Sequence, residues 1–142
     1  MRAVSTRERT VAELRTYLEH KRVEPAEIEA AVAELTVAGL VDDARYARRF
    51  AEDKRELQRW GSERIERDLR KRGIAPELIE SVLAATERST ELDSAVSLLR
   101  ERFGPPGDDR ERDRAWRLLV RRGYEPELAY EAVREAGRAT PA

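Results

Sequence analysis

Seven basic side chains in the stretch 45–71 are spaced so that they could form a charged surface on two helices. They are Arg45, Arg48, Arg49, Arg55, Arg64, Arg67 and Lys71. The first four lie off the apolar positions of their segment, and the last three, spaced three and four apart, would form one line on a helix. Arginine's planar fork suits both the carboxylates of a protein and the phosphates of a nucleic acid. We therefore predict a partner-binding surface here, which we call the middle basic set.

The net charge of the whole chain bears on which partner the middle basic set could bind. The 142 residues include 28 basic and 29 acidic side chains, for a formal net charge of -1. Only the segment 43–72 is clearly positive, with 11 basic and 7 acidic residues. A free-standing DNA-binding protein usually has a larger basic excess. The balance argues against DNA as the sole partner.

Pairing within one helix is an alternative for much of this charge. Four pairs of opposite charge stand four residues apart, at Glu63 and Arg67, Glu66 and Arg70, Arg64 and Asp68, and Asp68 and Arg72. Each such pair would stabilise a solvated helix by roughly 0.2–0.5 kcal/mol without binding anything. For any single arginine this alternative stays open, so the set as a group is the better prediction.

The two tryptophans could serve as stacking surfaces for exposed bases. Trp116 stands beside the apolar positions Ala115 and Leu119, which favours a place in the core. Trp60 falls in a turn of the basic segment, so both interpretations remain open for it.

The sequence offers few residues for catalysis, cofactor binding or metal binding. The chain has no cysteine, and its one histidine, His20, has no second imidazole with which to share a metal. We find no phosphate-binding glycine loop and no nucleophile with a base, so we expect no enzyme, no cofactor and no metal. No apolar run approaches the roughly 18 residues of a membrane span, so we expect no membrane partner and a cytoplasmic protein.

An internal repeat organises the elements that carry these side chains. Pro25, Pro76 and Pro126 are 51 and 50 residues apart, and each follows a leucine by seven positions. Each proline suits the first position of a helix, and Gly73 and Gly123 suit the end of the preceding one. Arg22 stands at the glycine position of the first copy, so we expect a different or looser turn there.

Further helices link the copies. One begins at Asp42 or Asp43 and is predicted to turn Tyr46, Ala47, Phe50, Ala51 and Leu57 inward; another runs from about Thr90, with Thr90 and Asp93 resembling a capping box. No segment shows sustained two-residue alternation. We predict an all-α, elongated array of tandem three-helix repeats with about eight short helices. Its expected divisions are 1–41, 42–88 and 89–142.

Three stretches of the sequence resemble a known family. The stretches GLVDDARYARRF, WGSERIERDLRKRGI, and FGPP followed by WRLLVRRGY resemble, in order and spacing, the RecX recombination regulators. The resemblance implies tandem three-helix repeats and a protein that modulates RecA, the recombinase that forms a filament on single-stranded DNA. It implies an inhibitor or tuner of RecA that blocks filament growth or promotes disassembly and lowers ATP hydrolysis and strand exchange. The RecA filament is the expected partner, with weak direct DNA binding as an open alternative. A monomer is the simplest expectation.

Two departures from the family pattern accompany the resemblance. Members commonly begin with an extra helix before the one that contains Leu14, and here only MRAV stands in that place, so we expect a first repeat that lacks its first helix. A Gly-x-Gly-Pro turn of the family is here Arg59, Trp60, Gly61 and Ser62. We expect Ser62 to replace proline as an N-cap. One of the aspartates Asp42 and Asp43 is likewise expected to cap the helix that follows, a structural role.

Two other functions remain open. A helix-turn-helix-like DNA-binding module would explain short helices and arginines, but it predicts a concentrated basic excess. A helical-repeat scaffold for another protein fits everything except the stretches that resemble RecX.

Overall fold

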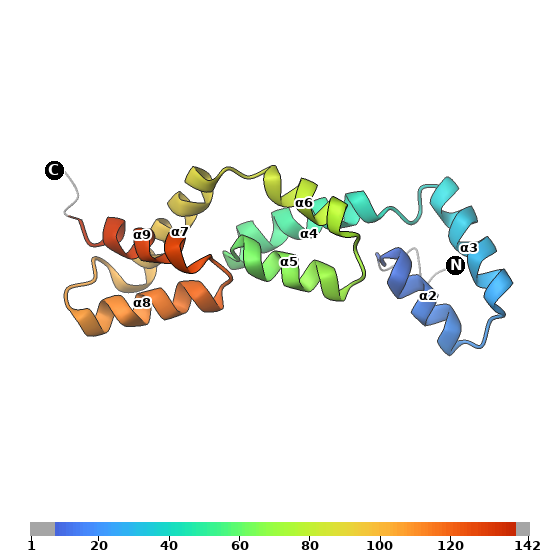
Figure 1. The fold of residues 1–142 in the computed structure, drawn as a ribbon, viewed down its shortest axis with the longest axis horizontal. Coiled ribbons are helices and arrows are strands. Elements are labelled where there is room, and N and C mark those ends of the chain that lie inside the picture. The colour runs from blue at the N-terminus through green and yellow to red at the C-terminus, as the bar shows by residue number, and fades with distance from the viewer. Residues whose placement is uncertain (1–7, 139–142) are drawn as a thin grey trace.

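The computed structural model describes residues 8–138, and within that range the chain forms eight helices and no strand (Figure 1). The helices form three groups that follow one another in a row. The first unit contains α2 (Val11–His20) and α3 (Pro25–Val37). The middle unit contains α4 (Asp43–Gln58), α5 (Ser62–Lys71) and α6 (Pro76–Ala84), and the last unit contains α7 (Arg88–Phe103), α8 (Asp109–Arg121) and α9 (Pro126–Ala136). The prediction that the first repeat lacks a helix before the one that contains Leu14 concerns residues that lie largely outside the described range.

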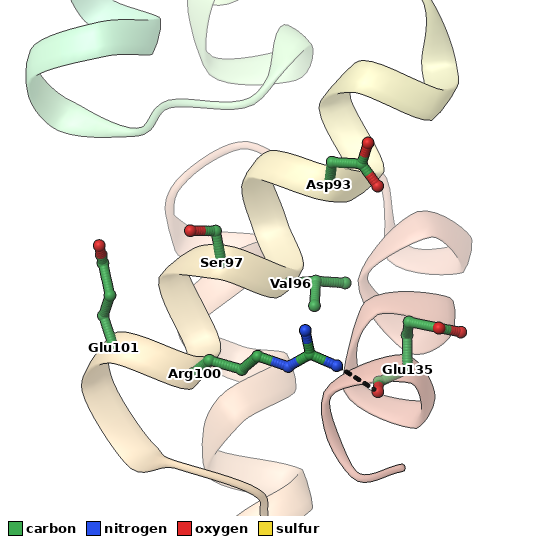
Figure 2. Close-up of a pocket in the computed structure, with 6 residues that line it drawn as sticks. All are labelled: Asp93, Val96, Ser97, Arg100, Glu101 and Glu135. Atoms are coloured by element: carbon green, nitrogen blue, oxygen red, sulfur yellow. Dashed lines mark hydrogen bonds between the residues drawn. The ribbon is translucent and has the colours of Figure 1, made fainter. Parts of the chain in front are cut away.

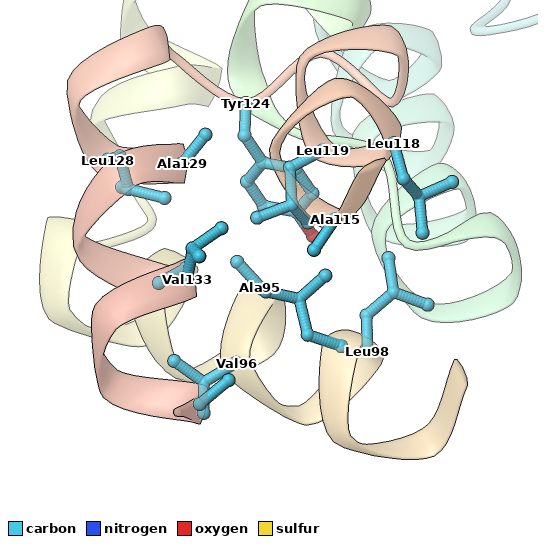
Figure 3. Close-up of a cluster of buried hydrophobic side chains, with 13 residues drawn as sticks. Ala95, Val96, Leu98, Ala115, Leu118, Leu119, Tyr124, Leu128, Ala129 and Val133 are labelled. Carbon is cyan, nitrogen blue, oxygen red and sulfur yellow. The ribbon is translucent and has the colours of Figure 1, made fainter. Parts of the chain in front are cut away.

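Each unit has its own small hydrophobic core. The first is built around Leu14, Ile28 and Val32, and the middle one around Ile65, Leu69 and Trp60. The core of the last unit has the most members, and α7, α8 and α9 all contribute to it (Figure 3). Leu99, Leu119 and Tyr124 are its largest fully buried side chains. The predicted divisions at 41/42 and 88/89 fall between these three cores, and we keep them as a proposal.

The helix-turn-helix of each copy has the same backbone. In all three, the residue after the C-cap adopts a left-handed conformation, with φ of 60° at Arg22, 82° at Gly73 and 96° at Gly123. In each, two backbone hydrogen bonds close the turn, as in Val23 N–H to Leu18 O and Arg22 N–H to Glu19 O. The expectation of a looser turn at Arg22 was therefore wrong.

Glycine is needed at the other two turns because a neighbouring unit touches them. A Cβ at Gly73 would overlap the Cβ of Ala12 at the start of α2, and a Cβ at Gly123 would overlap the Cβ of Arg64 near the start of α5. Arg22 lies exposed at the end of the first unit. An L side chain can adopt its left-handed backbone at a cost of about 1 kcal/mol, whereas no side chain fits at the other two positions.

Two joints of similar design hold the units in a row. In the first, the buried Thr10 hydroxyl donates to Arg72 O (2.7 Å), and the Val11 N–H donates to an Asp43 carboxylate oxygen (2.9 Å). In the second, the Gly61 N–H donates to Arg122 O (2.8 Å) and the Glu63 N–H donates to Gly123 O (2.9 Å). In both, the N-terminus of one unit's helix meets the turn of the next unit along the chain.

Three details differ from the sequence-based expectations. Leu57 is 78% exposed, because the chain leaves α4 at Arg59 and Trp60 folds back into the core in its place. The helix α7 begins at Arg88, with Glu87 at the N-cap, so Thr90 and Asp93 form no capping box. Ser62 is the first residue of α5 and not its N-cap, which is Gly61.

Candidate functional site

The arginines near the start of α4 differ in how many hydrogen bonds and ion pairs they form. Arg45 donates to Gly39 O (3.1 Å), and Arg49 forms an ion pair with Glu8 (3.1 Å). Arg48 is exposed and has no hydrogen-bond or ion-pair partner within residues 8–138. Of the three, Arg48 is the one whose charge no described residue engages.

Arg55 belongs to a joint between units. Its guanidinium donates to the Ser62 hydroxyl (2.9 Å) and lies 3.8 Å from Glu91. Glu91, on α7, also accepts the Ser62 N–H (2.6 Å) and the Ser62 hydroxyl (2.8 Å). The side chains of Arg55 and Glu91 are 18% and 11% exposed, so this cluster is mostly shielded from solvent. The capping group of α5 thus comes from the last unit, which explains why Ser62 need not cap its own helix.

The line on α5 is more accessible. Arg67 and Lys71 are exposed and have no polar partner in the described part of the chain. Arg64 is different: its guanidinium lies over the Trp60 ring, 4.0 Å from the ring centre, and donates to Arg121 O (3.3 Å). Arg64 therefore fixes the second joint, while Arg67 and Lys71 are available to a partner.

Pairing within α5 accounts for little of this charge. Of the four predicted pairs, Glu66 and Arg70 form an ion pair (2.6 Å). The other three pairs are not within ion-pair distance in the structure of residues 8–138. The alternative of a fully self-paired helix face does not apply to Arg67.

The aromatic residues of the middle unit form a covered row. The ring centres of Tyr46 and Phe50 are 6.2 Å apart, as are those of Phe50 and Trp60. Trp60 is only 8% exposed. Arg72 donates to the Tyr46 hydroxyl (2.9 Å) and Lys54 lies over the Trp60 ring. This row packs against the core and leaves little ring surface for a base to stack on.

The two aspartates serve two different helices. Asp42 is the N-cap of α4 and accepts the Arg45 N–H (3.1 Å). Asp43, in the first turn of α4, accepts the Val11 N–H at the start of α2. One aspartate therefore starts a helix, and the next one ties the first unit to the middle unit.

A second basic cluster lies in the last unit, and the sequence analysis did not identify it. A groove of about 320 Å³ between α7 and α8 is lined by Phe103, Leu118 and four arginines. These are Arg102, Arg114, Arg117 and Arg121. Arg117 pairs with Asp113 (3.0 Å), and no described residue pairs with the other three. Arg114, Arg117 and Arg121 each stand 50 residues after a member of the α5 line. This repeat of basic positions could have been found in the sequence, but a count of net charge by segment does not show it.

The hollow between α7 and α9 offers different chemistry. It measures about 530 Å³, and three of its six lining residues are acids, with Asp93 and Glu101 on α7 and Glu135 on α9 (Figure 2). Arg100 reaches across and donates to the Glu135 carbonyl oxygen (3.3 Å). Ser97 is its one hydroxyl, with no histidine or cysteine in the lining. Within the described residues Ser97 forms no hydrogen bond with any of these carboxylates, so the hollow holds no nucleophile paired with a base.

The described residues contain neither a metal-binding cluster nor a membrane-spanning helix. No group of three or more His, Cys, Asp or Glu side chains there could hold a metal ion. No helix among residues 8–138 is long and apolar enough to cross a membrane.

Comparisons with known proteins point to one family. The model of the first three-helix domain of RecX matches residues 1–35, and that of the second matches residues 42–83. The chain is similar to the regulatory protein RecX of Leptothrix cholodnii, at 35% identity over 96% of this chain and 85% of that protein. It is 37% identical to the regulatory protein RecX of Mycolicibacterium vanbaalenii, over 94% of this chain and 77% of the relative.

Solved structures share the fold. The crystal structure of RecX from Lactobacillus salivarius superposes with a TM-score of 0.84, at 19% identity, over 95% of this chain and 90% of that one. A second crystal structure of a regulatory protein RecX gives a TM-score of 0.78 at 20% identity, and this chain covers 66% of it.

Proposed function

Because this chain belongs to the RecX family of regulatory proteins, we propose that it binds the RecA recombinase and its filament on single-stranded DNA. In this proposal it limits filament growth and thereby lowers ATP hydrolysis and strand exchange. It does so by occupying the filament surface and not by catalysis. The protein acts in the cytoplasm, where the filament forms.

The observation that carries this proposal is the set of unengaged cations on the middle unit of an elongated row. Arg48, Arg67 and Lys71 are exposed and have no polar partner among residues 8–138. They stand on helices fixed by two joints, so a partner need not order the backbone that presents them. Charge-assisted hydrogen bonds to carboxylates or phosphates would supply both affinity and orientation.

The near-neutral total charge supports a protein partner in addition to DNA. A module that bound DNA alone would rely on a large basic excess, and its affinity would fall steeply with salt. Here the basic segment is offset by acidic residues elsewhere, for a net charge of -1. Such a surface is better suited to a mixed target that carries protein side chains as well as phosphates.

The test is the ATPase rate of RecA on single-stranded DNA, measured with increasing amounts of this protein. We expect inhibition at well below one copy per RecA subunit. The double variant Arg67→Glu, Lys71→Glu is expected to lose most of that inhibition while keeping its helical circular dichroism. A matched control, Lys21→Glu with Arg22→Glu, makes the same charge change at the exposed end of the first unit.

Each result separates the alternatives. Equal inhibition by both variants would exclude the middle unit as the contact surface. An ATPase rate unaffected by excess wild-type protein would overturn the proposal and favour a scaffold for another protein. Binding to bare DNA as tight as to the RecA filament would favour the DNA-binding module.

A further inference from the structure

We propose that the outer face of α3, at one end of the row, is a docking site for a basic amphipathic helix of another protein. The face consists of Ala26, Ala30, Ala33 and Val37, all of which are exposed. Val37 is 90% exposed, and Leu40, just past the end of the helix, is 50% exposed. At 100° per residue, the four positions fall within about 60° of one another, on the side opposite the core residues Ile28, Val32 and Leu35.

The equivalent positions in the last unit are charged. Counted from the proline that begins each helix, α9 carries Glu127, Glu131 and Arg134 where α3 carries its three alanines, and Arg138 stands where α3 has Val37. These four charged residues are exposed, although all three helices of the last unit are present. The outer face of α3 is therefore not the place where another helix of its own unit would pack.

The position of α3 in the row makes an apolar outer face costly. Figure 1 shows α3 at one end, with no further unit beyond it. End units of a repeat array normally have a polar outer face, because no neighbouring unit covers it. The last unit follows this rule with the charges of α9, and the first unit does not. An uncovered apolar face of this kind is typical of a surface that meets a partner.

The charges beside the face indicate which partner fits. From its N-cap to its last residue, α3 contains four glutamates and no basic residue. Glu27 and Glu34 lie along one side of the face and Glu29 along the other, which are the places of e and g residues beside an a/d seam. Glu29 pairs with Arg15 (2.9 Å), whereas Glu27 and Glu34 have no ion-pair partner within residues 8–138. Lysine or arginine at the e and g positions of a docked helix would complement them.

A second copy of α3 does not meet this requirement. In an antiparallel pair of α3 helices, Glu27 of one copy would face Glu34 of the other. In a parallel pair, Glu34 would face Glu29. Like charges at these positions disfavour pairing in both directions. The charge complementarity therefore favours a basic helix from a different protein over a dimer of this chain.

The size of the face predicts a weak and reversible contact. From Ala26 to Val37 it is about 17 Å long, enough for three turns of a partner helix. The alanines let a partner backbone approach closely but bury little apolar surface, and Val37 supplies most of the bulk. The contact would be additional to the proposed filament contact, since α3 carries no member of the middle basic set.

The experiment compares two fluorescein-labelled peptides that bind the full chain, measured by anisotropy. Both have leucine at the a and d positions and a staple on the outer side that keeps them helical as monomers. One has lysine at e and g, and the other has glutamate. We expect the lysine peptide to bind at least about tenfold more tightly than the glutamate peptide.

Two variants locate the binding to α3. Ala30→Gln with Val37→Gln, which changes no charge, should weaken binding of the lysine peptide at least about fivefold, because Val37 no longer offers apolar surface. The matched control Ala44→Gln with Leu57→Gln alters exposed apolar residues of α4 and should keep the wild-type affinity. Glu27→Gln with Glu34→Gln should reduce the preference for the lysine peptide at least about threefold. Circular dichroism checks that each variant keeps its helical content.

Four outcomes would overturn the proposal. They are no binding of the lysine peptide by the wild type, equal affinity for both peptides, and an equal loss in the α3 variant and the α4 control. The fourth is a dimer of the wild type in sedimentation that Ala30→Gln with Val37→Gln dissociates, which would assign the face to a second copy. Because RecA is absent from all of these measurements, they stand apart from the ATPase test of the proposed function.

Discussion

Gly123 shows how one residue can fix the relation between two units. Its φ of 96° alone would make a side chain costly there, and the adjacent Arg64 leaves no space for a Cβ. Gly39 provides a matched control, since its φ is 75° and nothing lies within 4 Å of the position a Cβ would take. Gly39→Ala should therefore lose only the conformational term, about 1 kcal/mol.

We expect Gly123→Ala to lose about 1–3 kcal/mol of unfolding free energy beyond the loss in Gly39→Ala, because the added methyl must push α5 away from the turn. Chemical denaturation of the two variants measures the difference. Equal losses would mean that the joint adapts without strain and that contact between the units is weak.

Tyr124 leads to a prediction about alkaline pH. Burial raises the pKa of its phenol above the ordinary value near 10, and the hydrogen bond with Ser94 (3.4 Å) opposes this only in part. Between the two pKa values the unfolded chain has lost the proton and the folded chain has kept it, so stability falls as pH rises above about 10. Tyr124→Phe should show a shallower fall in melting temperature over this range. Tyr130→Phe, at a 60% exposed position, should follow the wild type.

The aspartate pair was partly predictable at this scale. A sequence of two aspartates before a helix indicates an N-cap, and Asp42 occupies that position. The contact of Asp43 with α2 could not be predicted, because it depends on how a helix 32 residues earlier is docked. We expect Asp42→Ala with Asp43→Ala to lower the melting temperature more than it lowers the affinity, per folded molecule, for RecA, the proposed partner. A stable double variant that cannot bind RecA would contradict this.

At the scale of elements, Glu91 is a cap supplied from outside its helix. It accepts two hydrogen bonds from Ser62 and lies beside Arg55, in a place shielded from solvent. Glu91→Ala leaves the Ser62 N–H of α5 without its acceptor and removes the carboxylate beside Arg55, which should destabilise the protein by about 1–3 kcal/mol.

The control for this change is Glu101→Ala. Glu101 pairs with Arg59 (3.1 Å) across the same pair of units, but its side chain is 59% exposed. Such exposed pairs contribute about 0–1 kcal/mol. Thermal unfolding of both variants decides whether burial, and not pairing alone, gives the joint its strength; equal destabilisation would contradict this.

The helices themselves were largely predictable, and the contacts between units were not. Proline at the first position and apolar spacing indicate each repeat hairpin without reference to the rest of the chain. The basic line of α8 could also have been predicted by aligning Arg114 with Arg64. Its continuity with α5 could not, because it depends on a joint between residues about 60 apart in sequence, Glu63 and Gly123.

At the scale of the whole molecule, the three small cores make the row longer than an ordinary domain. A compact chain of 142 residues would have a radius of gyration of about 14.5 Å. The units meet through helix ends and turns and not through a shared core, so the measured value should be clearly larger. Small-angle X-ray scattering at low protein concentration tests this.

The same measurement distinguishes a rigid row from a collapsed one. If the joints hold as the hydrogen bonds of Thr10 and Gly61 indicate, the radius of gyration should stay constant as salt is raised, because neither joint depends on exposed ion pairs alone. A value near 14.5 Å would mean that the units fold back on one another. A filament-binding surface that spans more than one unit would then not exist.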